Sequence, residues 1–413
     1  MTDWVTRMER VMNPGLARVF RFMGLGAVEH TGRGAEVIDD AGRRYIDCAS
    51  GYGVLNQGYL HPRIVAAARA QLAELAMSSR VLINRQAIEL AEYLAQVTPG
   101  DLQYSFFVNS GAEAVEAALK LARYATGRTR VVTTVGAFHG KTLGALSVSG
   151  RALYQDPFRP LLSDVIHVPY GDLAAAEAVI DHRVAAVVVE PIQGEAGIVV
   201  PPQDYLPGLR QACDRVGAAL VADEVQTGIG RTGYLFAVEA SEIVPDLLCL
   251  AKSLGGGVVA IGAVVGRPWV WRMFSEQPLL HTSTFGGNPL ATRVALEALK
   301  VTVEEKLPSR ARELGAWFLS RLRDLAEQYP HVVKEVRGRG LMIGVEFVAP
   351  GMAAAVIAEL FERGILAVYT LNNERVIRLM PPLVIARSEL STVLAALQEV
   401  LAVVAEMAAD LEG

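Results

Sequence analysis

The stretch Ala218-Ala219-Leu220-Val221-Ala222-Asp223-Glu224-Val225-Gln226 places two carboxylates at the end of a short apolar run. A second run, Leu247-Leu248-Cys249-Leu250-Ala251, ends in Lys252 and is followed by a glycine-rich segment. Short, continuously apolar strands are typical of a parallel sheet that is covered on both faces. Ligands of such sheets bind outside the carboxyl ends of the strands. The two runs therefore predict an α/β fold with Asp223 and Lys252 at one crevice.

Asp223 and Lys252 are a chemically informative pair. A lysine forms Schiff bases with carbonyl compounds, and a carboxylate holds a protonated pyridine nitrogen, so the pair matches the needs of pyridoxal phosphate (PLP). The alternative is that Lys252 extends its ammonium into solvent at a sheet edge while Asp223 caps a helix. The two residues alone leave both interpretations open.

The composition favours a compact enzyme with more than one domain. With 413 residues, the chain exceeds the size at which a single core keeps growing. The formal net charge is −5 and no block of Lys or Arg occurs, so we expect neither nucleic acid nor a membrane as a partner. The three cysteines are far apart, which predicts reduced core residues and a cytoplasmic location.

Both ends of the chain bear on that location. Residues 1–10 carry charges where a signal peptide needs its apolar region. The apolar stretch 390–409 is interrupted by Gln398, Glu399 and Glu406, which predicts a packed helix and not a membrane span.

We expect three parts along the chain. An N-terminal segment at 1–57 packs with the small domain, a large PLP-binding domain covers 58–300, and a small α+β domain covers 301–413. The segment 36–47 has a turn signal at its centre and predicts a hairpin. The C-terminal part predicts helices over 309–328 and 353–363, and strands over 341–347, 365–369 and 375–379.

Another predicted strand end carries a possible anion site. The run 105–108 leads into Asn109-Ser110-Gly111-Ala112, which opens a helical pattern. Ser110 and the amides of Gly111 and Ala112 are thus predicted at a helix N-terminus, where free N–H groups bind phosphate. The alternative is that Asn109 or Ser110 only caps the helix.

Two further strand ends supply an aromatic, a histidine and carboxylates. The run 130–135 precedes Phe138 and His139. Phe138 could stack on a flat heterocycle or belong to the core. We expect His139 to play a supporting role. The run 184–189 precedes Glu190 and Glu195. No cluster of His or Cys joins them, so we expect no metal site.

The segment Gly228-Ile229-Gly230-Arg231-Thr232-Gly233 matches the G-x-G-x-x-G pattern of dinucleotide-binding proteins. In such proteins the glycines directly follow a strand and open a helix. Here Asp223 and Glu224 intervene and would repel a pyrophosphate, and no helix start follows. The context therefore disfavours a nicotinamide-dependent dehydrogenase.

Four segments together resemble the class III, fold type I aminotransferases: Asp-Glu-Val-Gln-Thr-Gly at 223–228, Gly-Arg-Thr-Gly at 230–233, Ala-Lys-Ser-Leu-Gly-Gly-Gly at 251–257 and Ser-Thr-Phe-Gly-Gly-Asn-Pro at 283–289. The resemblance implies a large domain with a mostly parallel seven-stranded sheet, a smaller α+β domain, and a homodimer with shared active sites. It implies PLP as the cofactor, with Lys252 as the Schiff-base lysine and Asp223 on the ring nitrogen. The other cofactor-binding residues that it implies are Ser110, Gly111, Ala112, Phe138, His139, Glu190, Val225, Gln226 and, from the neighbouring subunit, Thr284.

The resemblance also bears on the substrates. Arg378 resembles a carboxylate-binding arginine of the family, Glu195 resembles the glutamate that pairs with it when a substrate without an α-carboxylate is bound, and Tyr52 falls in the same pocket. The motifs look most like the putrescine (diamine) aminotransferases. This implies ping-pong transfer of an amino group from a diamine or ω-amino donor, with putrescine as the first candidate, to a 2-oxo acid such as 2-oxoglutarate or pyruvate.

Several alternatives remain open from the sequence. One is an acetylornithine/ornithine-type or other ω-amino acid aminotransferase, and another is an enzyme that aminates long aliphatic aldehydes. A third is a PLP-binding protein without turnover, although the presence of Lys252, Asp223 and Arg378 together argues against it.

Overall fold

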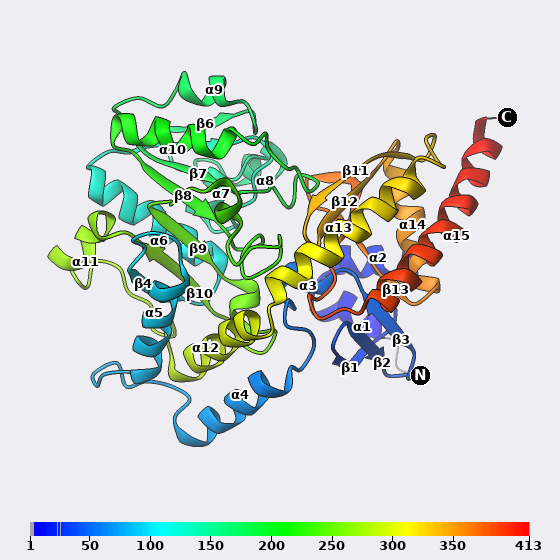
Figure 1. Ribbon diagram of the computed structural model, residues 1–413, viewed down its shortest axis with the longest axis horizontal. Helices are drawn as coiled ribbons and strands as arrows, with labels where there is room; N and C mark the ends of the chain where they lie inside the picture. The colour runs from blue at the N-terminus through cyan, green and yellow to red at the C-terminus, as the bar shows by residue number, and fades with distance from the viewer. Residues whose placement is uncertain (1–3, 23, 25, 413) are drawn as a thin grey trace.

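The computed structural model describes residues 4–22, 24 and 26–412. Its largest sheet has seven strands in the order β4-β10-β9-β8-β7-β5-β6 (Figure 1). Adjacent strands from β9 to β6 are parallel, and β10 runs antiparallel to both β9 and β4. The strands are β4 (Tyr104–Val108), β5 (Arg130–Thr134), β6 (Val165–Val168), β7 (Val184–Val189), β8 (Ala219–Asp223), β9 (Leu247–Leu250) and β10 (Gly262–Gly266). The predicted α/β fold with a mostly parallel seven-stranded sheet is confirmed.

Helices cover both faces of this sheet. Along β8, Leu220 and Ala222 pack into a core shared with α5, α10 and α12, whereas Ala219 and Val221 pack into a core shared with α6. Successive strand residues point to opposite faces, so a sheet covered twice requires continuously apolar strands. The helices of this part are α4 (Pro62–Glu74), α5 (Arg85–Val97), α6 (Gly111–Thr126), α7 (Leu143–Val148), α8 (Ala152–Gln155), α9 (Leu173–Glu177), α10 (Tyr205–Val216), α11 (Arg272–Glu276) and α12 (Pro289–Glu304).

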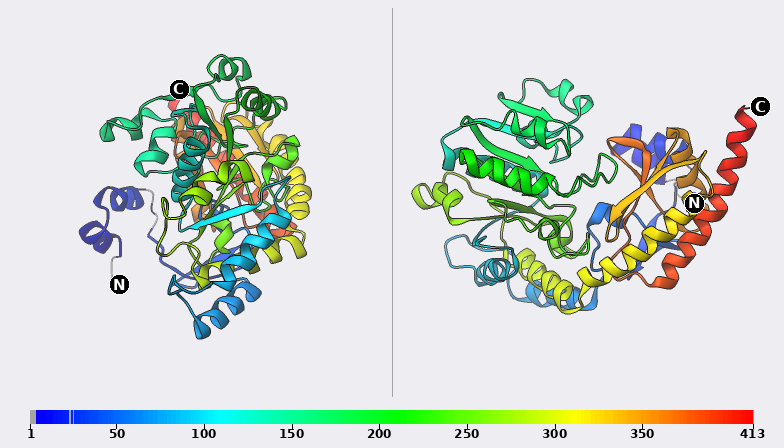
Figure 2. Two further views of the ribbon diagram at one scale, coloured as in Figure 1. Left: turned by 90° about the vertical axis from the view of Figure 1, so that its left-hand side faces the viewer. Right: turned by 45° about the horizontal axis from the view of Figure 1, so that its top comes forward.

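Two four-stranded sheets lie beside the large one, and α12 and α13 run from one part of the molecule to the other (Figure 2). Their strand orders are β1-β2-β3-β13 and β11-β12-β15-β14. The strands are β1 (Glu29–Arg33), β2 (Glu36–Asp39), β3 (Arg44–Asp47), β11 (Val333–Arg339), β12 (Met342–Phe347), β13 (Ile365–Leu366), β14 (Val368–Thr370) and β15 (Asn373–Leu379). The remaining helices are α1 (Trp4–Val11), α2 (Pro14–Phe22), α3 (Ser50–Gly53), α13 (Leu307–Ala326), α14 (Pro350–Glu362) and α15 (Arg387–Glu412).

The beginning and the end of the chain share a core. Ala35 and Cys48 pack with buried residues of α13, α14 and α15, and β13 pairs in parallel with β3. We propose the division 1–57, 58–300 and 301–413 as the domain organisation for this reason, although α12 continues past position 300 to Glu304.

The hairpin at 36–47 is confirmed as β2 and β3. Two other elements differ from expectation. The strand predicted over 365–369 is divided into β13 and β14, which belong to different sheets. The strand β11 was not predicted, because charged side chains separate its buried residues Val333 and Val336.

Within the described part of the chain, α15 is the one helix whose length and composition would let it cross a membrane. Its residues Leu390, Val393, Leu397 and Val400 are buried in the core that it shares with α13 and α14. This packing supports the interpretation of 390–409 as a core helix.

Candidate active site

The two residues that opened the sequence analysis lie at the ends of adjacent parallel strands. Asp223 is the last residue of β8, and Lys252 begins a short 3-10 turn (Lys252–Gly255) after β9. A cavity of about 570 Å³ lies beside them. Predicted site residues that line it are Ser110, Gly111, Ala112, Phe138, His139, Glu190, Glu195, Asp223, Val225, Gln226 and Lys252.

Lys252 presents an amine of lowered basicity to the cavity. Burial of the side chain, together with the nearby charge of Arg378, lowers the pKa of Lys252 to about 8, although Glu195 acts in the opposite direction. A larger share of neutral amine at physiological pH favours nucleophilic attack and proton transfer. The backbone of Lys252 has a φ of 48°, in the left-handed region that favours glycine.

Asp223 is held from behind by His139. Oδ2 of Asp223 lies 2.7 Å from Nδ1 of His139, and Oδ1 accepts a hydrogen bond from the Val225 amide at 3.0 Å. Burial alone would lower the pKa of His139, but the hydrogen bond and the charge of Asp223 raise it. His139 thus makes a buried charge-assisted contact that fixes the aspartate, and its supporting role in the site stays a prediction.

Glu190 orients two loops of the cavity wall. Its carboxylate accepts hydrogen bonds from the Phe138 amide and the Gly194 amide, each at 3.0 Å. Burial raises the pKa of Glu190 to about 7, with a further contribution from Asp223, while His139 opposes the shift. Both oxygens are occupied by backbone donors, so this side chain positions Phe138.

The start of α6 fits an anion. Ser110 is the N-cap, and its Oγ accepts a hydrogen bond from the Glu113 amide at 3.2 Å. Gly111 and Ala112 are the first two residues of the helix, whose amides have no acceptor within it. A Cβ on Gly111 would lie 2.8 Å from Cγ1 of Val225, so glycine allows Val225 to approach. Both interpretations of Ser110, as a cap and as part of an anion site, are compatible with this arrangement.

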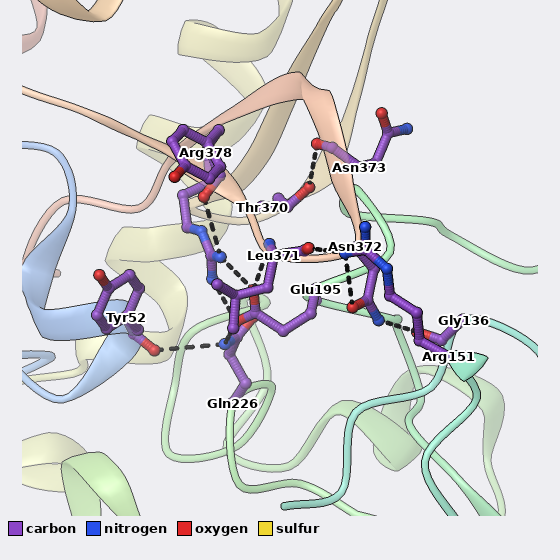
Figure 3. Close-up of polar contacts among 12 residues, drawn as sticks. Tyr52, Gly136, Arg151, Glu195, Gln226, Thr370, Leu371, Asn372, Asn373 and Arg378 are labelled. Carbon is purple, nitrogen blue, oxygen red and sulfur yellow. Dashed lines mark hydrogen bonds and ion pairs between the residues drawn. The ribbon is translucent and has the colours of Figure 1, made fainter. Parts of the chain in front are cut away.

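Arg378 and Glu195 form a buried ion pair at the edge of the cavity (Figure 3). Nη1 of Arg378 donates to Oε1 of Glu195 at 2.7 Å, and Nη2 donates to Oε2. Burial opposes ionisation of Glu195, but the contact with Arg378 outweighs it and lowers the pKa of the glutamate to about 2. Because Glu195 lines the cavity and Arg378 does not, the glutamate covers the arginine.

Gln226 and Tyr52 flank this pair. Nε2 of Gln226 donates to Oε1 of Glu195 at 3.3 Å and to the Tyr52 carbonyl at 3.4 Å. The guanidinium of Arg378 lies 5.2 Å from the centre of the Tyr52 ring. Tyr52 is not among the residues that line the main cavity; it lines a separate cavity of about 660 Å³ together with residues of β2, β3 and α14.

Thr284 does not line the main cavity in the single chain. It is exposed and borders another cavity, of about 440 Å³, together with Asn109, Glu113, Lys120 and His281. Its assignment to the site of a neighbouring subunit stays a prediction.

The glycine-rich segment 228–233 has a structural role that the sequence did not reveal. All six residues are buried, and the guanidinium of Arg231 donates to Asn56 Oδ1, the Leu341 carbonyl and the Pro381 carbonyl at 2.6, 2.9 and 2.6 Å. The segment therefore connects the two parts of the molecule and does not form an exposed phosphate loop.

Sequence reasoning also missed part of the cavity wall. The residues 257–261 line the cavity, as do Val54 and Asn109. No chemically distinctive side chain marks 257–261, although Gly256 and Gly257 follow the 3-10 turn that begins at Lys252. Among the described residues, no group of three or more His, Cys, Asp or Glu could hold a metal ion.

The residues present fit PLP. The cavity brings together a lysine, an acid for a ring nitrogen, an aromatic face and a helix N-terminus for a phosphate. In addition, Oε1 of Gln226 is buried and has no hydrogen-bond partner among the described residues, which leaves a polar atom at the cavity for a ligand.

Comparisons with known proteins agree with this geometry. Residues 25–401 match the family described as Aminotransferase class-III. The chain is 46% identical, over 386 residues, to a putrescine aminotransferase of Pectobacterium atrosepticum, covering 91% of this chain and 82% of the relative.

Solved structures give the same result. An ornithine aminotransferase from Toxoplasma gondii ME49 superimposes with a TM-score of 0.88 and 38% identity, covering 92% of each chain. A second structure of the Toxoplasma gondii enzyme, with PLP at partial occupancy in its active site, has a TM-score of 0.87 and 38% identity, covering 93% of this chain and 91% of that one. The chain therefore belongs to the class III aminotransferases, transaminases that depend on PLP.

Proposed function

We propose that this transaminase moves an amino group from a diamine or ω-amino donor, with putrescine as the first candidate, to a 2-oxo acid such as 2-oxoglutarate or pyruvate. The observation that carries the proposal is the ion pair in which Glu195 covers Arg378 at the cavity. The similarity to a putrescine aminotransferase supports the choice of donor.

The residues of the cavity divide the work of the reaction. PLP, when bound, accepts the electrons released as a proton leaves the carbon that bears the amine. Asp223, fixed by His139, would pair with the ring nitrogen, and the amides of Gly111 and Ala112 would hold the phosphate. Lys252, with its lowered pKa, would be the base that removes the proton from the amine-bearing carbon and delivers it to the cofactor. Phe138 and Val225 would pack on the two faces of the ring.

Arg378 and Glu195 let one cavity accept two kinds of substrate. A diamine carries a distal ammonium and no carboxylate, so an exposed guanidinium would repel it. Paired with Glu195, the guanidinium is neutralised and the diamine meets a carboxylate instead. A 2-oxo acid brings its own carboxylate, which can replace Glu195 on Arg378 through two parallel hydrogen bonds.

Separate measurement of the two half-reactions tests this proposal. Arg378→Ala should raise the KM for 2-oxoglutarate far more than that for putrescine, because a lost bidentate pair costs on the order of 2–4 kcal/mol and the diamine does not use it. Glu195→Gln should act in the opposite sense and raise the KM for putrescine. Arg375→Ala, an exposed residue on the same strand, is the matched control. Equal losses in both half-reactions for Arg378→Ala would show that the arginine is structural.

A second candidate donor is ornithine or another ω-amino acid, because the structural similarity to ornithine aminotransferases is strong. Enzymes for acetylornithine or for long aliphatic aldehydes remain further candidates. A screen with putrescine, cadaverine, ornithine, acetylornithine, 4-aminobutyrate and a monoamine, each against pyruvate and 2-oxoglutarate, distinguishes them. A preference for ornithine over putrescine would contradict the diamine proposal.

We also propose a homodimer. Two loops expose apolar side chains and are linked to one another: Arg80 donates to the Gly286 carbonyl at 2.9 Å, and Asn84 to the Gly287 carbonyl at 2.6 Å. The exposed side chains are Val81, Leu82, Ile83, Leu279 and Phe285, with exposed fractions from 64% to 89%. Exposed apolar groups gathered on adjacent loops are typical of an interaction surface, and Thr284 lies among them.

A cytoplasmic location is part of the same proposal. Cys48, Cys213 and Cys249 are buried free thiols. Reduced core cysteines suit a compartment in which thiols are kept reduced. Fractionation of the source cells would test this assignment.

A further inference from the structure

The turn between β14 and β15 lies against the ion pair of Glu195 and Arg378 (Figure 3). Leu371 and Asn372 form this turn, which is closed by a hydrogen bond of 2.8 Å from Thr370 Oγ1 to the Asn373 carbonyl. Arg378 lies farther along β15. The turn and the arginine therefore belong to one hairpin, whereas Glu195 comes from the loop after β7.

The turn holds Glu195 through two backbone amides. The Leu371 amide donates to Oε2 of Glu195 at 3.0 Å, and the Asn372 amide donates to the Glu195 carbonyl at 2.9 Å. Oε2 is also the oxygen that accepts from Nη2 of Arg378. One carboxylate oxygen is thus shared between the turn and the arginine that the carboxylate covers.

The outer side of the turn is anchored to the large domain. Nη1 of Arg151 donates to the Leu371 carbonyl, and Tyr154 OH donates to the same carbonyl at 3.1 Å. Nδ2 of Asn372 donates to the Gly136 carbonyl at 2.9 Å. The Leu371 carbonyl and the Asn372 N–H belong to one peptide unit, so these contacts fix the plane that binds the Glu195 carbonyl. The neighbouring Thr370–Leu371 peptide, whose N–H binds Oε2 of Glu195, is thereby held in place on one side.

We propose that Arg151 and Asn372 are positioning residues that hold the turn so that the Leu371 amide keeps Glu195 over Arg378. The inference rests on the proposed function, in which a 2-oxo acid must displace Glu195 from the arginine. Every hydrogen bond that Glu195 makes only in its covering position opposes that displacement. Arg151 and Asn372 therefore set the balance between the diamine and the oxo acid without contacting either substrate.

Substitutions that loosen the turn should strengthen the binding of an oxo acid, which is the opposite of what charge alone predicts. Arg151→Met removes a positive charge near the cavity, and electrostatic attraction alone would then weaken the binding of an anion. Our proposal requires the reverse, because a less firmly held Glu195 competes less well for Arg378. Asn372→Ala changes no charge and should act in the same direction.

The test uses the PLP-loaded enzyme and glutarate, a dicarboxylate that has no keto group and cannot react. The Kd for glutarate, measured by calorimetry, should fall by about twofold to tenfold in Arg151→Met and in Asn372→Ala, as expected for the loss of one hydrogen bond that holds Glu195. The KM for putrescine should rise by a similar factor, with little change in kcat. Arg151→Lys keeps a donor for the Leu371 carbonyl and should restore most of the wild-type values. Arg159→Met, which removes an exposed ion pair with Asp156, is the matched control.

A double-mutant cycle with Glu195→Gln separates this inference from the function on which it rests. Glu195→Gln should tighten glutarate binding by itself, and Arg151→Met should add nothing in that background. If Glu195→Gln tightens binding while Arg151→Met and Asn372→Ala leave it unchanged, the positioning role is wrong and the proposed function stands. The positioning role is also wrong if Arg151→Met tightens binding equally in both backgrounds. Unchanged affinity in Glu195→Gln itself would overturn the covering of Arg378, and this inference with it.

Discussion

Nδ1 of His139 and Oδ2 of Asp223 are 2.7 Å apart, and both side chains are buried at the end of the central sheet. The contact connects the loop after β5 with the end of β8, so two strand ends determine the position of one carboxylate. A group that must face a ring nitrogen from a fixed direction gains its orientation from such a neighbour.

The ionisation of His139 should appear in the pH dependence of stability. Burial would lower the pKa of His139 in the folded protein, but the contact with Asp223 raises it above the unfolded value of about 6.5. The contribution of His139 to the free energy of unfolding is therefore complete below the unfolded pKa, and it is lost as pH rises through the folded pKa. The difference in unfolding free energy between wild type and His139→Asn, measured on the apo protein, should therefore shrink as pH rises above about 6.5.

His167 provides the control for this measurement. Burial lowers the pKa of His167, although the hydrogen bond with the Ser149 carbonyl acts in the opposite direction. The contribution of His167 to the free energy of unfolding is therefore lost as pH falls. The stability difference for His167→Asn should change with pH in the opposite direction. The same trend in both variants would contradict the assigned contact between His139 and Asp223.

Replacement of Asp223 should slow the transfer of the amino group and spare the fold. We expect Asp223→Ala to raise the activation free energy by roughly 2–5 kcal/mol, because a buried charge-assisted contact is lost. The single-turnover rate should then fall by about 30-fold to several thousandfold. Asp214→Ala, which removes an exposed partner of Arg210 on α10, should leave the rate unchanged. A near-wild-type single-turnover rate for Asp223→Ala would remove this residue from the mechanism.

Replacement of Lys252 should abolish the covalent attachment of PLP. Purified wild-type protein should be yellow, and Lys252→Ala should lose that absorbance band while it still binds PLP noncovalently. Lys334 pairs with Glu346 on the sheet that contains β11 and β12. Lys334→Ala is therefore the control and should keep the band. An unchanged band in Lys252→Ala would assign the covalent bond to another amine.

Subunit mixing should show whether Thr284 serves the neighbouring site. If it does, heterodimers of Thr284→Ala and Lys252→Ala subunits contain one site with both defects and one site with neither. Half of the sites in purified heterodimers should then retain wild-type activity and PLP retention. Two sites with one defect each would place the contact of Thr284 within its own subunit.

The sequence predicted what depends on strand ends. Asp223, Lys252 and Ser110 each follow or end an apolar run, and parallel topology brings such ends together. The contacts of Glu195 with Gln226 and with the Leu371 amide were not predictable, because both join segments far apart in the chain, and the second uses a backbone group that every residue carries. The burial of Arg231 was hidden in a similar way, because two of its partners are backbone carbonyls of distant segments, which leave no mark on the sequence.

Selection for heat resistance alone would act against Lys252, the residue that we propose as the catalytic lysine. Lys252 has a φ of 48°, where a residue with a Cβ is disfavoured by about 1–2 kcal/mol, and folding also buries its amine away from water. In the absence of PLP, Lys252→Gly would relieve both burdens and yield a more durable but inactive protein. A screen for thermostable variants of this enzyme must therefore monitor turnover, because a stabilising substitution at Lys252 would also remove the amine that we propose for catalysis.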